Sequence, residues 1–333
     1  MPHAGHDPNT IAPDLARSPF IATWGRFVVH ARSGLSAAAM LVSVLLAGPA
    51  FGQGATSDLS GYEYYQPVEP TLLDISYAAL SPSEKLDLYL PAAKDGPAPL
   101  VIWIHGGGFS LGDKRSMPRR NFGLPPTPRG PDAPYQMQVP DVAALTHKGY
   151  AVVSLNYRLL RRPGDRFVDF ARPAVQDGKA AVRFLRANAA LYGLDPGKFA
   201  VWGNSAGGFI AAMLAATGDH PTIFDDPALG NPDVSGAVQA AVIWYGAIEA
   251  ADPEMQLSHH IGEAKIIPPF LIANGDADIN VPVDSAIRLN EELLMKGVKS
   301  TLAIVPGAGH EDPAFMATQM LPTFKFLDAT FDR

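Results

Sequence analysis

From about residue 72 onward, apolar runs of strand length alternate with longer segments that have helical apolar spacing. Apolar and polar residues alternate within 72–77 and 86–90, which predicts two paired strands at a sheet edge. Continuous apolar runs predict strands buried on both faces, and they occupy 99–104, 150–155, 198–202, 238–245, 270–273 and 301–305. Helices are predicted between them and after them, over 174–191, from 209, over 282–295 and over 314–331.

Strands that alternate with helices predict βαβ units, and therefore one mostly parallel, doubly wound α/β sheet with helices on both faces. Two insertions interrupt this rhythm. Residues 112–140 contain seven prolines, which remove backbone donors and block helices, so this stretch is predicted to be a loop. Residues 247–267 form a second, polar insertion. We expect both insertions to roof a site at the carboxyl ends of the strands.

The first 52 residues differ from the rest of the chain. Arg26 and Arg32 precede an apolar stretch at 35–48, and small residues follow it. This order is typical of a secretory signal peptide, and the apolar stretch is shorter than the about 20 residues of a membrane span. The sequence therefore predicts a leader at 1–52, a single domain at 53–333 and export to the periplasm or medium. An uncleaved membrane anchor or a tail is the alternative.

Composition removes several classes of function. The 333 residues include no cysteine, which excludes a thiol nucleophile, thiolate metal sites and disulfides. The net charge is -7 and no block of Lys or Arg occurs, so neither nucleic acid nor an anionic membrane is an expected partner. Once the leader is removed, no stable membrane association is expected.

Ser205 stands in the pentapeptide Gly-Asn-Ser-Ala-Gly at 203–207. The apolar run before it predicts a strand and the apolar run after it predicts a helix. This strand–turn–helix context is that of a nucleophile elbow, in which a serine projects from a tight turn and glycines flank it because a Cβ would not fit. Ser205 is therefore the predicted nucleophile.

A glycine run at 106–108 directly follows the predicted strand 99–104. Acyl transfer builds negative charge on a carbonyl oxygen, and preorganised backbone N–H groups stabilise that charge. An oxyanion loop is expected at this point of such a sheet, and the N–H of Ala206 would be a further donor. A plain glycine-rich turn is the alternative. His105, at the head of the run, is expected to brace the turn.

The general base is predicted largely by elimination. His310 follows the last predicted strand through a flexible Gly-Ala-Gly turn, at the sheet edge where catalytic groups collect. The other histidines after residue 52 are less suitably placed, at positions 105, 147, 220, 259 and 260.

Asp278, which follows the penultimate strand, is the predicted acid that orients His310. Asp276 is expected to bond to its own backbone as a turn former. Glu249 is the fallback acid.

No metal site is predicted. His259 and His260 are adjacent, and adjacent residues are not expected to place both rings on one helical face as i, i+4 spacing does. Asp276 and Asp278 resemble the start of a calcium loop, but the required glycine and bidentate glutamate are missing.

Taken together, these motifs resemble the α/β-hydrolase superfamily, in its carboxylesterase/lipase branch with a His-Gly-Gly-Gly motif. The matching segments are 105–109, 203–208, 275–282 and 309–310, while 86–91 and 156–159 look like secreted feruloyl-esterase-like and acetyl-esterase-like members. The resemblance implies an α/β-hydrolase fold, an acyl-enzyme, no cofactor, and oxyanion donors at Gly107, Gly108 and Ala206. Asn204 departs from the pattern, because many hormone-sensitive-lipase relatives have Asp there. The helical cap at the N-terminus of those relatives is also replaced here by the proline-rich insertion.

The predicted function is hydrolysis of a small-molecule carboxylic ester by Ser205, His310 and Asp278. Phe109 and Tyr135 are candidates for substrate contact, with ordinary packing as the alternative. An amidase, peptidase or formamidase would use the same triad, and transfer to an alcohol would use the same acyl-enzyme. A non-catalytic binding module is the remaining alternative. The sequence gives no oligomeric state.

Overall fold

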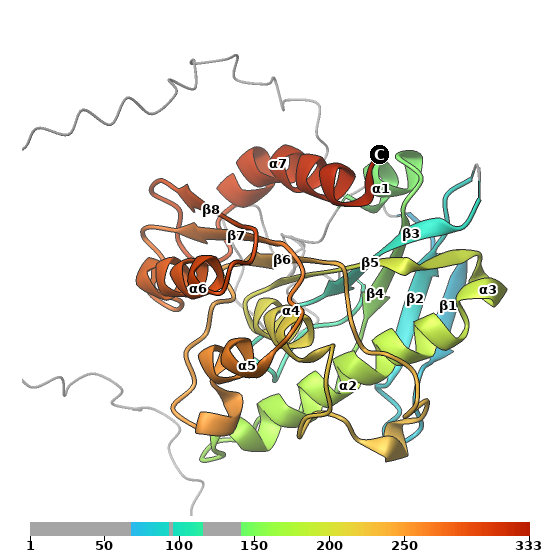
Figure 1. Cartoon of the computed structure of the whole chain (residues 1–333), viewed down its shortest axis with the longest axis horizontal. Coiled ribbons are helices and arrows are strands. Elements are labelled where there is room, and N and C mark those ends of the chain that lie inside the picture. The colour runs from blue at the N-terminus through green and yellow to red at the C-terminus, as the bar shows by residue number, and fades with distance from the viewer. Residues whose placement is uncertain (1–67, 93–95, 116–140) are drawn as a thin grey trace, which may run out of the picture. The chain divides into compact units, whose positions relative to one another are not determined.

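A single eight-stranded sheet forms the centre of the computed structural model, which describes residues 68–92, 96–115 and 141–333 (Figure 1). The strand order is β1-β2-β4-β3-β5-β6-β7-β8. The first two strands pair antiparallel at one edge, and the other pairs, apart from β2 with β4, are parallel. The strands are β1 Leu72–Ser76, β2 Lys85–Tyr89, β3 Ala98–Ile104, β4 Ala151–Leu155, β5 Leu194–Asn204, β6 Ala240–Trp244, β7 Phe270–Gly275 and β8 Ser300–Val305. The predicted α/β fold is confirmed.

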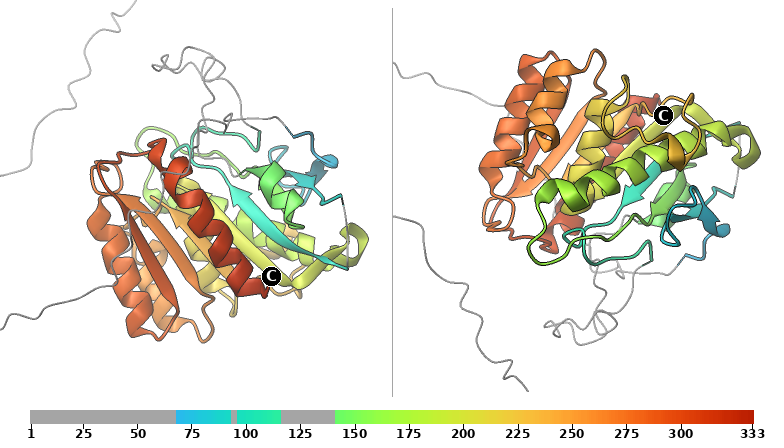
Figure 2. Two further views of the ribbon diagram at one scale, coloured as in Figure 1. Left: turned by 90° about the horizontal axis from the view of Figure 1, so that it is seen from above. Right: turned by 90° about the horizontal axis from the view of Figure 1, so that it is seen from below.

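Helices cover both faces of the sheet, as Figure 2 shows from above and below. One face packs against α1 Val142–His147 and α7 Ala314–Phe331. The other face packs against α2 Phe167–Ala187, α3 Ala189–Tyr192, α4 Ala206–Thr217, α5 Leu257–Glu263 and α6 Val283–Met295. Two short 3₁₀ turns, Pro227–Leu229 and Pro253–Met255, complete the described elements.

Three strands in the middle of the sheet are buried along their whole length, which explains their continuous apolar runs. Every residue of β3, β4 and β6 is buried. On the face covered by α7, Trp202 lies between Trp103 and Trp244, with ring centroids 5.7 and 5.0 Å apart in edge-to-face geometry. Such pairs stabilise a core beyond the area they bury. The middle of the sheet is thus a rigid support for the loops at its carboxyl edge.

Two elements differ from the sequence-based expectation. Helix α2 begins at Phe167, seven residues before the predicted start, and contains Pro173. Its first turn is held by the Asp169 carboxylate, which accepts a hydrogen bond from the Arg166 N–H at 3.2 Å. This bond compensates one free donor of the helix start. The polar insertion 247–267 also contains regular structure, namely the 3₁₀ turn and α5.

The predicted leader at 1–52 and residues 116–140 of the proline-rich insertion, which include Tyr135, lie outside the described residues. The proposed division into leader and single domain therefore stays a prediction. Among the described helices, none combines the length and the apolar character needed to cross a membrane.

Candidate active site

The loops after β5, β7 and β8 meet at the carboxyl edge of the sheet and bring together three predicted residues. The Nε2 atom of His310 lies 2.9 Å from the Oγ atom of Ser205. Its Nδ1 atom lies 2.7 Å from the Oδ2 atom of Asp278. Because a carboxylate only accepts, the Nδ1–H donates to Asp278 and leaves Nε2 free to accept the Ser205 hydroxyl proton.

Ser205 occupies a strained backbone conformation between β5 and α4, with φ 51° and ψ -123°. The turn is so tight that a Cβ at Gly203 would lie 2.2 Å from the carbonyl oxygen of Gly207. The Ser205 N–H donates to the carbonyl of Trp244 at 3.0 Å, which ties the turn to the end of β6. Strain of this kind persists where surrounding structure enforces it, and it often marks a functional position.

The carboxylate of Asp278 is buried, and both of its oxygen atoms accept hydrogen bonds. Its Oδ1 atom accepts the backbone N–H groups of Asn280 and Val281 at 2.8 and 2.9 Å, while Oδ2 faces His310. Burial alone would raise the pKa of Asp278, but the hydrogen bonds from His310 and Val281 outweigh it and hold the pKa below its ordinary value. Asp278 is therefore held ionised beside the imidazole.

The two other acidic residues considered from the sequence have different partners. Asp276 accepts the N–H of Gly307 at 2.6 Å, so it joins the acid loop to the loop of His310 and does not close its own turn as expected. Glu249 pairs with Arg288 at 2.5 Å on the surface. Neither of them is bonded to His310.

The glycine run after β3 adopts the unusual backbone expected of an oxyanion loop. Gly107 has φ 106° and Gly108 has φ 60°, both in the region that favours glycine. Asn204 joins this loop to the nucleophile turn, because its Oδ1 atom accepts the Gly106 N–H at 2.9 Å. Ala206 is the first residue of α4, where a backbone N–H has no partner within the helix. The three predicted donors thus belong to segments bonded side by side.

His105 braces this loop, as expected from the sequence. Its ring is buried and stacks on Tyr157 at 4.5 Å, and its Nδ1 atom lies 2.7 Å from the carbonyl oxygen of Gly106. The Tyr157 hydroxyl donates to the His105 carbonyl at 2.9 Å. Burial lowers the pKa of His105 to about 4. The ring is therefore neutral at physiological pH and serves as a packing and hydrogen-bonding element.

For Phe109, the structure favours the packing alternative over substrate contact. Its side chain is only 2% exposed. It packs edge-on or tilted against Tyr157, Phe167, Phe170 and Phe209, with centroids 5.4 to 6.5 Å apart. The ring thereby anchors the glycine-rich loop after β3 to α2 and α4.

Sequence reasoning missed Arg161, which lies beside the same loop. Its Nη1 atom donates to the carbonyl of Gly108 at 3.3 Å, and its own N–H donates to the carbonyl of Phe109 at 3.4 Å. The cluster of arginines at 158–166 was the available signal. Arg161 is exposed, so it adds a positive charge at the rim of the site.

The second insertion also lines a cavity. A cavity of about 210 Å³ lies between residues 247–258 and helix α6, with Ile248, Leu257, Ser285 and Arg288 in its wall. Ala247, one of its lining residues, directly follows Gly246, where a Cβ would lie 2.5 Å from the Cα atom of Gly208 in the first turn of α4. The insertion that lines the cavity thus begins beside the helix that Ser205 precedes.

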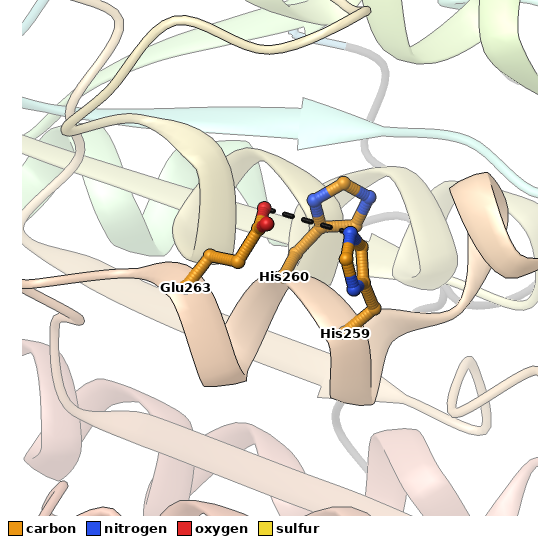
Figure 3. A group of neighbouring side chains, drawn as sticks. All are labelled: His259, His260 and Glu263. Atoms are coloured by element: carbon orange, nitrogen blue, oxygen red, sulfur yellow. Dashed lines mark ion pairs between the residues drawn. The ribbon is translucent and has the colours of Figure 1, made fainter.

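The adjacent histidines of α5 lie on different sides of the helix, because His260 is buried and His259 is exposed. Their rings nevertheless lie 5.1 Å apart, and potential ligand atoms of these two residues and Glu263 all lie within 4.8 Å of one another (Figure 3). Residues that do not share a helical face can therefore still bring ligand atoms close together, which the sequence-based argument did not consider.

A mostly parallel sheet of this order, with a serine on a sharp turn after β5 and a histidine after β8, defines an α/β hydrolase. Within that class, the chain belongs to the BD-FAE family, whose profile matches residues 86–123 and 131–267. The profile of the dienelactone hydrolase family matches residues 229–321.

The names of individual relatives are consistent with this family assignment. The probable carboxylic ester hydrolase LipM of Mycobacterium tuberculosis is 26% identical over 242 residues, which cover 64% of this chain and 49% of LipM. Carboxylesterase NlhH of the same species is 32% identical over 212 residues, covering 58% of this chain and 56% of NlhH. The chain thus spans about half the length of the curated relatives it matches.

A solved structure shows the same fold. Esterase 2 of Thermogutta terrifontis, phosphorylated by paraoxon, superposes with a TM-score of 0.61 at 22% identity. The match covers 80% of this chain and 96% of the esterase.

Proposed function

We propose that this protein hydrolyses carboxylic esters of small molecules through an acyl-enzyme on Ser205. The observation that carries the proposal is the unbroken hydrogen-bond line from Asp278 through His310 to Ser205, with lengths of 2.7 and 2.9 Å. The names of the relatives, which are carboxylesterases and ester hydrolases, favour an ester over an amide as the substrate.

In the acylation half-reaction, the Oγ atom of Ser205 attacks the ester carbonyl carbon while His310 takes the hydroxyl proton on Nε2. The ionised Asp278 stabilises the imidazolium that forms. Negative charge develops on the former carbonyl oxygen, and we assign its stabilisation to the N–H groups of Gly107, Gly108 and Ala206. The C–O bond then breaks, and the alcohol leaves with the proton from His310.

In the deacylation half-reaction, His310 removes a proton from a water molecule, which attacks the acyl carbon of the Ser205 ester. Collapse of the second tetrahedral intermediate returns the proton to Oγ and releases the carboxylic acid. No redox step or cofactor is needed in this sequence.

The cavity beside the second insertion is the proposed place for part of the substrate. It is supported by its place in the second insertion, which begins beside the first turn of α4, and its wall combines the apolar Ile248 and Leu257 with the polar Ser285 and Arg288. A concave site with polar groups in fixed positions is typical of small-molecule binding.

A short series of p-nitrophenyl esters, assayed beside an aminoacyl p-nitroanilide, tests this proposal. We expect turnover of the esters and little turnover of the anilide. Ser205→Ala should lower kcat by about 10⁴-fold or more, while Ser235→Ala, an exposed serine, controls for loss of a hydroxyl.

Preferential cleavage of the anilide would instead make the protein an amidase of the same fold. Paraoxon adds a covalent readout, because it should phosphorylate the wild-type protein once and leave Ser205→Ala unmodified. Equal ester turnover by Ser205→Ala and wild type would overturn the proposal.

We also propose that residues 1–52 direct export and are removed. The order of basic, apolar and small residues supports this. N-terminal sequencing of the protein recovered from a periplasmic or culture fraction should then begin near Gln53, whereas a cytoplasmic protein with an intact Met1 would contradict it.

A further inference from the structure

Two histidines lie near the C-terminal end of α4, which is the end farther from Ser205. In each of them, one ring nitrogen is hydrogen-bonded, and the other has no partner among the described residues. His260 is only 4% exposed, and its Nε2–H donates to the carbonyl of Glu254 at 2.9 Å. This bond fixes the tautomer, so Nδ1 carries a lone pair. Among the described residues, nothing donates to that buried Nδ1 atom. A buried acceptor without a partner costs free energy unless a ligand satisfies it.

His220 repeats this arrangement from the loop after α4. Its Nδ1–H donates to Asp219 at 2.5 Å, and its Nε2 atom is buried with no partner in the described part of the chain. The other carboxylate oxygen of Asp219 accepts the N–H groups of Lys265 and Ile266 at 2.9 and 2.8 Å. An imidazole held by a carboxylate on one nitrogen, with a lone pair on the other, is the usual arrangement of a metal-binding histidine.

The surroundings of His260 add two more ligand groups. The Nε2 atom of His259 lies 3.5 Å from the Oε2 atom of Glu263, and Figure 3 shows the ring of His260 beside these two side chains. One potential ligand atom from each of the three residues lies within 4.8 Å of the others. The side chains of His259 and Glu263 are about half exposed, so they are free to rotate toward a bound ion.

The loop of His220 lies beside the end of α5, because Asp219 accepts the N–H groups of Lys265 and Ile266 there. Imidazole must be neutral to bind a metal, and a carboxylate supplies negative charge to the ion.

We propose that His259, His260 and Glu263 bind a zinc ion, and that His220, which lies outside this group of ligand atoms, reaches the ion as the fourth ligand by movement of its side chain. Zinc prefers four tetrahedral ligands, and imidazole and carboxylate groups are common among them. With metal–ligand bonds of about 2.0–2.1 Å, tetrahedral ligand atoms lie roughly 3.4 Å apart. The exposed His259 and Glu263 therefore have to close in by about an ångström on the buried His260.

The location makes this site structural and not part of the ester chemistry. Helix α4 has 12 residues and is therefore about 18 Å long, with Ser205 before its first turn and His220 shortly after its last. A bound ion would cross-link the loop after α4 to α5, within the insertion that lines the cavity. The proposal stands whether or not the protein hydrolyses esters.

Isothermal titration of the chelator-treated full chain with zinc chloride is the first test. We expect one saturable site and a thermal midpoint that rises with zinc concentration, because an ion that binds only the folded state stabilises it. The zinc Kd of His259→Gln and of Glu263→Gln should be at least about tenfold weaker. His147→Gln removes an exposed helical histidine elsewhere and should match wild type.

Magnesium and cobalt sharpen the test. Magnesium should not raise the thermal midpoint, because it prefers oxygen ligands. Cobalt(II) should give the intense visible absorption of a tetrahedral site in wild type and in His147→Gln, but not in His259→Gln. Absence of saturable zinc binding to wild type, or equal zinc affinity in the His259 and His147 variants, would overturn the proposal.

Discussion

The two ends of helix α4 use histidine in different ways. Before its first turn, His310 has both ring nitrogens bonded, one to Asp278 and one to Ser205. Beyond its last turn, His220 and His260 have one bonded nitrogen each, and within the described residues the other has no partner. An imidazole between a donor and an acceptor passes a proton, whereas one with a buried lone pair is suited to hold an ion. The number of hydrogen-bond partners of each imidazole thus distinguishes proton transfer from ion binding.

The largest expected effect is at the proton-transfer end. Asp278→Asn should lower kcat for a p-nitrophenyl ester by about 10⁴-fold, because an amide can donate to Nδ1 and favours the wrong tautomer of His310. Asp276→Asn is the matched control, since Asp276 bonds to Gly307 and not to the imidazole. If the two ends of α4 have separate roles, zinc affinity is unchanged in both variants. A kcat equal to wild type in Asp278→Asn would remove Asp278 from the mechanism.

The tight turn around Ser205, at the same end of α4, should not tolerate an added methyl group at Gly203. A Cβ at position 203 would lie 2.2 Å from the Gly207 carbonyl oxygen, so Gly203→Ala forces backbone to move. We expect a loss of about 3 kcal/mol in the free energy of unfolding, measured by urea denaturation. Gly262→Ala, in α5, meets nothing within 4 Å and should change that free energy little. Equal stability of the two variants would contradict the geometry of the turn.

A third buried imidazole, His105, allows a pH test of stability. Its folded pKa of about 4 lies below the ordinary 6.5, so between these values the unfolded chain binds more protons. Stability from this residue is therefore present above pH 6.5 and is lost as pH falls toward 4. The expected loss is about 2 kcal/mol between pH 7 and pH 5, measured by urea denaturation.

His105→Gln supplies the reference for that measurement. Glutamine does not titrate in this range, so the fall in unfolding free energy between pH 7 and pH 5 should be about 2 kcal/mol smaller in the variant. The same fall in both proteins would show that His105 is not the group responsible.

The smallest expected change lies at the far end of α4. Asp219→Asn weakens the hold on His220 and should reduce zinc affinity about tenfold, while kcat/KM for an ester stays within about twofold of wild type. Titration and steady-state kinetics on the same preparation measure both quantities. A large loss of kcat/KM with normal zinc affinity would reverse the roles assigned to the two ends.

The strands and the triad residues could be predicted because their signals are local. Buried strands require continuous apolar residues, and the turn at Ser205 requires glycines at fixed spacing. His310 and Asp278 each follow a predicted strand end, so parallel topology alone brings them to the same edge of the sheet.

Features that depend on particular side-chain contacts were not predictable. The early start of α2 rests on the bond between Asp169 and Arg166, whereas the predicted helix began only after Pro173. Helix α5 is short, and its polar residues read as a loop. The convergence of His259 and His260 depends on side-chain rotation, which adjacency in the sequence does not reveal.

The hydrogen bond between Ser205 and His310 joins residues that are 105 positions apart in the chain. During synthesis, a ribosome that has just added the serine must therefore extend the polypeptide through three further strands before the imidazole exists. Under the proposed mechanism, a growing chain that already carries Ser205 is inert toward esters until translation has passed the last strand.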